Sequence, residues 1–269
     1  MKWGIIGTGN MGSMLATALT TSGAIQEEDL FVFNRSTEKA QALCQSFENV
    51  TVSTDLSKMA RVCDVLFMCV KPHDYKKVLE GIATELKEDQ CLVSITSPVS
   101  VEELEQVVPC QVARIVPSIT NHAFAGVSLF TVGTRVSNDY KKALEHAFKQ
   151  FSTPVAVEEP FIRVSSDIVS CGPAFVSFLL KEWITAAHQV AGISEEQATQ
   201  LTEQMIVGLG QLISQEIFSL EQLMEKVTVK GGVTGVGLEA LENHTGDLFK
   251  EMFKATQRKH LEDKQQIDF

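Results

Sequence analysis

Two glycine-rich stretches hold the residues whose types and spacing predict chemistry. The first, Gly7-x-Gly9-x-x-Gly12, follows the short apolar run WGII and precedes a helical pattern. Between a strand and a helix, this spacing allows a tight turn, close approach of the backbone to a pyrophosphate, and close helix–strand packing, and the helix N-terminus attracts the anion. We therefore predict that a dinucleotide is bound by residues of this loop: Gly7, Thr8, Gly9, Asn10, Met11 and Gly12.

The end of the second predicted strand decides which dinucleotide is favoured. NAD sites carry an Asp or Glu there, which accepts hydrogen bonds from the ribose hydroxyls. This chain has Asn34, Arg35 and Ser36 instead. A guanidinium, a hydroxyl and an amide are suited to a 2′-phosphate, so we predict NADP, with NAD as the alternative. A solvated Arg35 without a ligand is the other interpretation of this loop.

A third segment follows the fourth predicted strand. Val70, Lys71 and Pro72 lie where that strand ends, at the carboxyl edge of the predicted sheet. In open α/β sheets a cofactor binds at this edge. We expect Lys71 to lie near a phosphate or ribose and Pro72 to shape the turn.

The second glycine-rich stretch, KGGVTGVG at residues 230–237, lies in a region of helical patterns. Consecutive backbone N–H groups at a helix start bind a carboxylate, and a hydroxyl orients it. We predict a carboxylate-binding substrate site formed by Lys230, Gly231, Gly232 and Thr234. Lys230 either adds positive charge to that site or points into solvent.

The elements that must position these residues fall into two groups. Up to residue 158, apolar runs alternate with helical patterns, which predicts βαβ units and a doubly wound, Rossmann-type sheet. The expected strands are 2–7, 29–34, 50–53, 64–71, 90–96, 111–118 and 126–133. From residue 159 to 269 we predict an all-helical domain, in which the short VTV at 227–229 is the remaining strand signal.

Composition narrows the function classes. The chain has 269 residues and a formal net charge of −11, which argues against binding nucleic acid or an anionic membrane. Its six cysteines form no CxxC pair and its six histidines have no metal-ligand spacing. We expect reduced thiols, no metal site, no signal peptide, no membrane-spanning window and a cytoplasmic location.

Several motifs in the right order resemble the pyrroline-5-carboxylate reductase family over nearly the whole chain. They are IGTGNMGSMLATAL, FNRSTEKA, MCVKPHDYKKVL, RIVPSITNHAFAGVSLF, SCGPAFVSFLLKEW and VTVKGGVTGVGLEALE. The resemblance implies an NAD(P)H-binding Rossmann domain, a helical domain interlocked with a partner subunit, and hydride transfer to the C=N bond of 1-pyrroline-5-carboxylate, giving proline. It also implies that Thr234 contacts the substrate, which makes Thr234 the predicted catalytic residue.

Three segments depart from the family pattern. The chain reads VPSIT at 116–120, VSCGPAF at 169–175 and VKGGVT at 229–234, where the family usually has MPNTP, SGSGPAY and SPGGTT. The resemblance is therefore to a divergent, late-competence branch with developmental associations. Two hypotheses follow. The first is an NADPH-dependent imine reductase, and the second is a cofactor-binding paralogue with a regulatory role and little proline-forming activity.

Other residues give weaker signals. His122 could donate a proton or face solvent, and Cys171 could be a reactive thiol or a buried replacement for serine. The β-hydroxyacid dehydrogenases also begin with GTGNMG, but the lysine that they need lies four residues after a glycine. Lys181 lies nine residues after Gly172, which disfavours that class.

The second domain also predicts self-association. The segments FVSFLLKEWITAA and MIVGLGQLI are apolar on more than one face, and the domain is too short to bury them all within one subunit. We predict a homodimer through the helical domain, and the family also includes larger rings.

Overall fold

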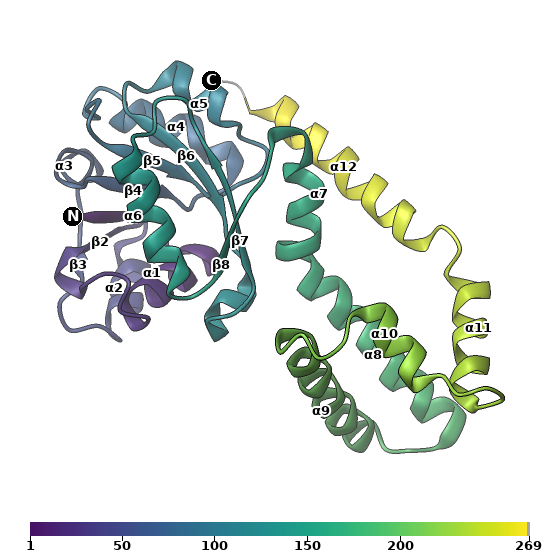
Figure 1. Ribbon diagram of the computed structural model, residues 1–269. Coiled ribbons are helices and arrows are strands. Elements are labelled where there is room, and N and C mark those ends of the chain that lie inside the picture. Colours follow the sequence, from purple (N-terminus) through teal and green to yellow (C-terminus); the bar gives the residue numbers. More distant parts are fainter. Residues whose placement is uncertain (268–269) are drawn as a thin grey trace. The chain divides into compact units, whose positions relative to one another are not determined.

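The computed structural model describes residues 1–267 and divides into two compact units. The first contains Met1–Pro173 together with the chain from Ala255 onward, and the second is Ala174–Lys254. In Figure 1 the strands of the sheet are coloured from purple to teal, and the helices later in the chain are coloured from green to yellow.

The first unit is built on an eight-stranded sheet with the order β3-β2-β1-β4-β5-β6-β7-β8. All neighbouring strands are parallel except β6 and β7. The strands are β1 (Trp3–Ile6), β2 (Leu30–Phe33), β3 (Thr51–Val52), β4 (Val65–Met68), β5 (Cys91–Ser94), β6 (Gln111–Val116), β7 (Val127–Val132) and β8 (Thr153–Ala156). The strand order reverses direction between β1 and β4, which is where doubly wound sheets bind ligands.

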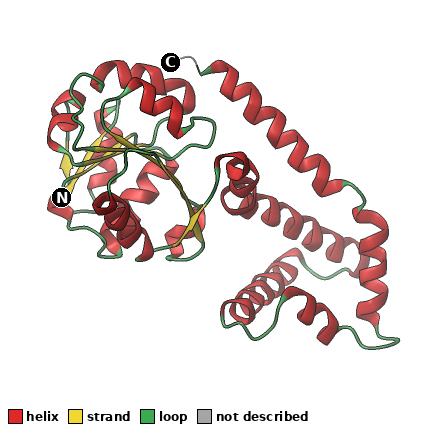
Figure 2. Ribbon diagram, turned by 45° about the horizontal axis from the view of Figure 1, so that its top comes forward, coloured by secondary structure: helices red, strands yellow, loops and turns green. Residues whose placement is uncertain are grey.

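Helices cover both faces of this sheet, as Figure 2 shows for the strands seen nearly on edge. Alternate residues of β1, β4 and β5 point to opposite faces, so Ile5 and Ile6 enter different cores. One core contains side chains from α1 (Asn10–Thr21), α2 (Thr37–Cys44) and α6 (Asn138–Lys149). The other contains side chains from α3 (Leu56–Val62), α4 (Tyr75–Ile82) and α5 (Val101–Val107). Burial on both faces explains the continuous apolar runs of the central strands.

The chain leaves the sheet through a long helical stretch. The 3-10 turn η4 (Glu159–Phe161) leads into α7 (Ile162–Ser166), the π-helical turn η5 (Asp167–Cys171) and α8 (Gly172–Ala191). In the first unit, Ile162 is buried with Val116 and Leu129, so this stretch is anchored on β6 and β7. A π-turn inserts an extra residue into a helix and is often found at functional sites.

The second unit consists of helices and contains most of α8. The others are α9 (Glu195–Ser214), α10 (Leu220–Val227), α11 (Val233–Thr245) and the first part of α12 (Leu248–Gln266). The predicted all-helical character is confirmed. The VTV segment forms no strand, because Thr228 ends α10 and the chain turns there.

One expectation is wrong. The continuous helix Glu159–Ala191 is long and apolar enough to cross a membrane by length and composition, because it contains an 18-residue window with a mean hydropathy of 1.2. No such window was expected from the sequence. A core helix of a soluble protein meets the same criterion, and apolar residues on more than one face are also what a helix at a subunit interface requires.

Candidate functional site

The first glycine loop joins β1 to α1, and its three glycines have different physical roles. Gly7 has a φ of +103°, a conformation that disfavours any side chain. A Cβ on Gly12 would lie 1.9 Å from the Gly7 carbonyl oxygen, so glycine is required for the helix to approach the strand. A Cβ on Gly9 would meet nothing within 4 Å, which leaves the backbone of this residue open to a ligand.

The N-terminus of α1 is available to an anion. Gly9 is the N-cap residue, and no side chain caps the helix. The first backbone N–H groups of a helix lack intrahelical partners and carry the positive end of the helix dipole. The hydroxyl of Thr8 is buried and has no hydrogen-bond partner among the described residues. A bound phosphate would satisfy groups of this kind.

Asn34 connects the glycine loop to the loop after β2. Its Oδ1 accepts a hydrogen bond from the Thr8 backbone amide at 3.1 Å, and its Nδ2 donates to the Ser36 carbonyl at 3.0 Å. Asn34 lines the cavity described below, but its amide group is engaged by the protein. Its structural contribution is to hold the two predicted cofactor loops together.

Ser36 has a partner that the sequence did not reveal. Its hydroxyl donates to Glu38 at 2.7 Å, and this hydrogen bond lowers the pKa of the Glu38 carboxyl. The Ser36 hydroxyl must therefore leave the carboxylate before it can donate to a phosphate. Arg35, the neighbouring residue, is exposed and lines the same cavity.

A cavity of about 600 Å³ lies at the carboxyl ends of β1, β2 and β4. It brings together most of the predicted cofactor residues, namely Gly7, Thr8, Gly9, Asn34, Arg35, Ser36, Val70 and Lys71. Of the other predicted cofactor residues, Asn10, Met11 and Gly12 form the first turn of α1, and Pro72 begins the 3-10 turn η2 (Pro72–Asp74). The predicted segments therefore meet at one edge of the sheet.

The cavity also contains cationic residues that sequence reasoning missed. Lys39, on the first turn of α2, and Lys77, on α4, join Arg35 and Lys71 in its lining. Asp74 is the acidic residue among the lining side chains. A locally positive cavity in a chain of net charge −11 fits a phosphorylated ligand. The sequence signal for Lys39 was its position one helical turn after Ser36, which places it near the same loop.

The predicted substrate residues lie in the second unit, at the start of α11. Gly231 has a φ of +75°, Gly232 is the N-cap residue, and no side chain caps this helix. Thr234 lies in the first turn and is half-buried, while Lys230 is exposed. The structure thus has the glycine turn and helix start that the sequence predicted, and this helix start carries no side-chain cap.

The VPSIT segment is tied to the π-helical turn by reciprocal hydrogen bonds. Ser118 donates to the Val169 carbonyl at 2.6 Å, and Ser170 donates to the Pro117 carbonyl at 2.8 Å. The Ser118 oxygen also accepts hydrogen bonds from the amide and hydroxyl of Thr120. Ser118 is therefore fully engaged within the protein. His122, in the following turn, is exposed.

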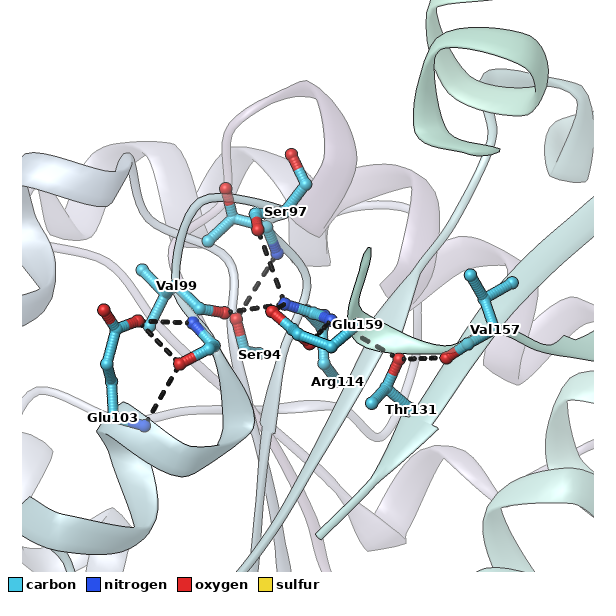
Figure 3. A network of polar contacts seen from close by, with 10 residues as sticks. Ser94, Ser97, Val99, Glu103, Arg114, Thr131, Val157 and Glu159 are labelled. Atoms are coloured by element: carbon cyan, nitrogen blue, oxygen red, sulfur yellow. Dashed lines mark hydrogen bonds and ion pairs between the residues drawn. The ribbon is translucent and has the colours of Figure 1, made fainter. Parts of the chain in front are cut away.

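Arg114 lies at the centre of a polar network at the end of the sheet (Figure 3). Its guanidinium is fully buried, donates to the carbonyls of Ser97 and Val99, and pairs with Glu159. Arg163, on α7, donates to the Ser97 hydroxyl at 2.9 Å and pairs with buried Asp167 at 2.6 Å. Two arginines therefore hold Ser97, in the loop after β5.

The remaining sequence candidates show no catalytic geometry. Cys171 is half-buried in η5, with its Sγ 3.4 Å from an Arg163 nitrogen. Burial raises the pKa of the Cys69 thiol in the cavity wall well above its usual range. Among residues 1–267, no group of three or more His, Cys, Asp or Glu side chains could hold a metal ion.

Comparisons with known proteins agree with this architecture. Residues 2–98 match the family described as NADP oxidoreductase coenzyme F420-dependent, and residues 159–263 match pyrroline-5-carboxylate reductase dimerisation. The chain therefore has the two-part organisation of an NAD(P)-dependent oxidoreductase with a helical dimerisation region.

Individual relatives define the family. Over 263 residues the chain is 43% identical to ComE operon protein 4 of Bacillus subtilis (strain 168), and the aligned region covers 98% of this chain and 96% of the relative. It is 29% identical over 258 residues to pyrroline-5-carboxylate reductase 3 of the same strain, covering 96% and 94%. The chain belongs to the pyrroline-5-carboxylate reductase family.

Solved structures show the same fold. A pyrroline-5-carboxylate reductase from Coxiella burnetii superposes with a TM-score of 0.86 at 25% identity, covering 100% of this chain and 99% of that one. The Plasmodium falciparum pyrroline carboxylate reductase with NADP bound gives a TM-score of 0.84 at 25% identity, covering 100% and 98%.

Proposed function

We propose that this protein is a cytoplasmic, NADPH-dependent imine reductase that acts on 1-pyrroline-5-carboxylate or a close analogue. The observation that carries the proposal is the cavity at the strand-order reversal, where an open glycine loop, an uncapped helix start and four cationic side chains meet. Membership of the family supplies the reaction class. NAD remains the alternative cofactor.

The described residues divide the proposed binding of the cofactor among three loops. The Gly7–Gly9 turn and the first amides of α1 would hold the pyrophosphate. Arg35 and Lys39 would hold the 2′-phosphate, because both line the cavity beside the end of β2. NADPH bound there would supply the hydride for the imine carbon and leave as NADP⁺, and the imine nitrogen would take up a proton.

The substrate would be held by the start of α11. Its uncapped amides and the Thr234 hydroxyl suit a carboxylate, which is the fixed negative group of the proposed substrate. Gly231 and Gly232 leave that backbone accessible, and Lys230 adds a cation nearby. We propose Thr234 as the residue that orients the substrate, and residues 159–269 as the domain that carries it.

We propose a homodimer formed through this helical domain. Its apolar side chains are exposed within one chain, as Phe178 at 62%, Val190 at 88% and Val233 at 90% exemplify. Soluble chains rarely leave so much apolar surface uncovered, and the match to a dimerisation family covers these residues. Higher oligomers would bury the same kind of surface.

A second candidate is a cofactor-binding paralogue with a regulatory role and little proline-forming activity. Two observations favour it: the 43% identity to ComE operon protein 4, and the altered VPSIT segment, in which Ser118 is fully engaged within the protein. Such a paralogue would bind NADPH in the same cavity, so the two candidate functions differ only in whether pyrroline-5-carboxylate is reduced.

One experiment separates them. NADPH is titrated against the purified protein by calorimetry, and NADPH oxidation is then followed with pyrroline-5-carboxylate. Binding with turnover supports the reductase. Binding without turnover supports the regulatory paralogue for this substrate, and the absence of NADPH and NADH binding contradicts both.

A further inference from the structure

Tyr75 begins α4 and is a large, fully buried polar side chain beside the cofactor cavity, although it does not line it. Its phenol oxygen lies 3.0 Å from the Met68 carbonyl oxygen and 3.0 Å from the Ser94 hydroxyl. Met68 ends β4 and Ser94 ends β5, and the two residues are paired in the sheet. One phenol therefore joins the carboxyl ends of two neighbouring strands.

The direction of these hydrogen bonds follows from counting protons. A carbonyl oxygen only accepts, so the single phenol proton is donated to Met68, and the Ser94 hydroxyl must donate to the phenol oxygen. The Ser94 oxygen then accepts from the Thr96 backbone amide at 3.4 Å. Burial raises the pKa of Tyr75, which keeps its proton in place at physiological pH. The result is a directed chain from Thr96 through Ser94 and Tyr75 to Met68.

This hydrogen-bond chain ends at Met68, directly before the residues that line the cavity. Cys69, Val70 and Lys71 directly follow Met68, and all three line the cavity. The glycine loop also rests on this segment, since a Cβ on Gly7 would lie 2.7 Å from the Cys69 carbonyl oxygen. A small shift of the β4 end therefore moves both the wall and the turn that is proposed to bind the pyrophosphate.

We propose that Tyr75 and Ser94 are positioning residues for the dinucleotide, acting by fixing the segment Cys69–Lys71 through this hydrogen-bond chain. The inference rests on the proposed function, because it assigns a role in binding NADPH. It adds two residues that do not line the cavity and for which the sequence predicted no role.

A second tyrosine of the protein provides a matched control. Tyr140, on α6, also donates its phenol proton to a backbone carbonyl, that of Asp89, at 2.6 Å. Asp89 precedes β5, at the opposite end of that strand from Ser94, and neither Tyr140 nor Asp89 lines the cavity. Tyr75→Phe and Tyr140→Phe thus remove the same chemical group, once beside the cavity and once away from it.

The test measures the Kd for NADPH by calorimetry and the melting temperature of each full-length variant. Tyr75→Phe and Ser94→Ala should each raise the Kd about five-fold or more, the value of a net hydrogen bond. The Kd of the double variant should be higher than that of either single variant. The total increase should be smaller than the product of the two single increases, because both substitutions break the same hydrogen-bond chain. Tyr140→Phe should lower the melting temperature without changing the Kd.

The inference is overturned if both Tyr75→Phe and Ser94→Ala bind NADPH as wild type does, or if Tyr140→Phe weakens binding equally. Ser94→Ala decides the matter alone if Tyr75→Phe does not fold, since it leaves Tyr75 and its hydrogen bond to the Met68 carbonyl in place. Failure of the wild type to bind NADPH is a separate result, which overturns the proposed function and this inference with it.

Discussion

Arg114 and Glu159 form an ion pair in which the arginine is fully buried and the glutamate is one-third exposed. Arg114 comes from β6, in the middle of the C-terminal half of the sheet, and Glu159 comes from the turn before α7. The pair fastens the beginning of the long helix to the sheet, as the labelled side chains of Figure 3 show.

Glu159→Ala should destabilise the protein strongly. The variant leaves the buried Arg114 charge with two carbonyls and the Thr131 hydroxyl, without a carboxylate. We expect a loss of about 2–4 kcal/mol in the free energy of unfolding. Glu85→Ala is the control, because Glu85 pairs with half-exposed Arg61 and such surface pairs contribute about 0–1 kcal/mol. Equal losses in urea titrations of the two variants would contradict this ranking.

Gly9→Ala should impair cofactor binding and leave folding intact. Gly9 has a φ of −73°, which alanine adopts easily, and its Cβ would project into open space. That space is where we place the pyrophosphate, so we expect the Kd for NADPH to rise about tenfold or more. Gly12→Ala should instead prevent stable folding, because its Cβ overlaps the Gly7 carbonyl. Normal NADPH binding by Gly9→Ala would move the pyrophosphate elsewhere.

Arg35→Asp should shift the cofactor preference from NADPH towards NADH. Arg35 lines the cavity, and a charge-assisted hydrogen bond to phosphate contributes about 1.5–3 kcal/mol, or roughly 10- to 100-fold in the ratio of affinities. Lys142→Asp on α6 makes the same change of net charge away from the cavity. Titrations of both cofactors check this, and an unchanged ratio in Arg35→Asp would rule out the 2′-phosphate assignment.

The sequence predicted the sheet and the glycine turns because their signals are local. Strands buried on both faces read as apolar runs, and a turn with positive φ at Gly7 requires glycine. β8 was missed because it is a mostly exposed edge strand that contains Pro154, so its sequence shows neither an apolar run nor a clear alternation.

The rest of the site depends on contacts between distant segments. Lys77 lines the cavity only because of the way in which α4 is rotated about its axis. Tyr75 and Ser94 form a hydrogen bond although they are 19 residues apart in the sequence. The Ser36–Glu38 hydrogen bond depends on side-chain conformation, so its competition with a phosphate could not be anticipated. Residue types therefore predicted the edge of the sheet where we propose that the cofactor binds, while the hydrogen bonds of Tyr75 became visible only in the structure.

His260 should make the protein less stable in mild acid. It lies on α12, half-buried, and its Nδ1 has no hydrogen-bond partner among the described residues. Burial, and then the positive charges of Arg163, Lys264 and Arg114, lower its pKa, while Asp263 opposes them. Because the folded state resists protonation, the free energy of unfolding should be highest above the ordinary pKa of about 6.5 and fall as the pH drops through it.

His260→Gln should reduce this loss between pH 7.5 and pH 5.5 in urea titrations. His146→Gln, at an exposed position on α6, is the control and should retain the wild-type slope. An identical pH dependence for wild type and His260→Gln would show that other groups account for the acid sensitivity.

Thr234→Ala should reduce turnover of pyrroline-5-carboxylate while leaving the Kd for NADPH unchanged. Thr234 lies in the uncapped first turn of α11, and loss of a hydrogen bond to a charged carboxylate costs about 1.5–3 kcal/mol, or roughly 10- to 100-fold in kcat/KM. Thr245→Ala, at the other end of the same helix, is the matched control, since its hydroxyl donates to the Leu241 carbonyl. Val233→Thr restores the hydroxyl that the family pattern has at the exposed neighbouring position, and should raise kcat/KM. If Thr234→Ala lost only NADPH affinity, Thr234 would belong to the cofactor site, and the start of α11 would not be where the substrate carboxylate binds.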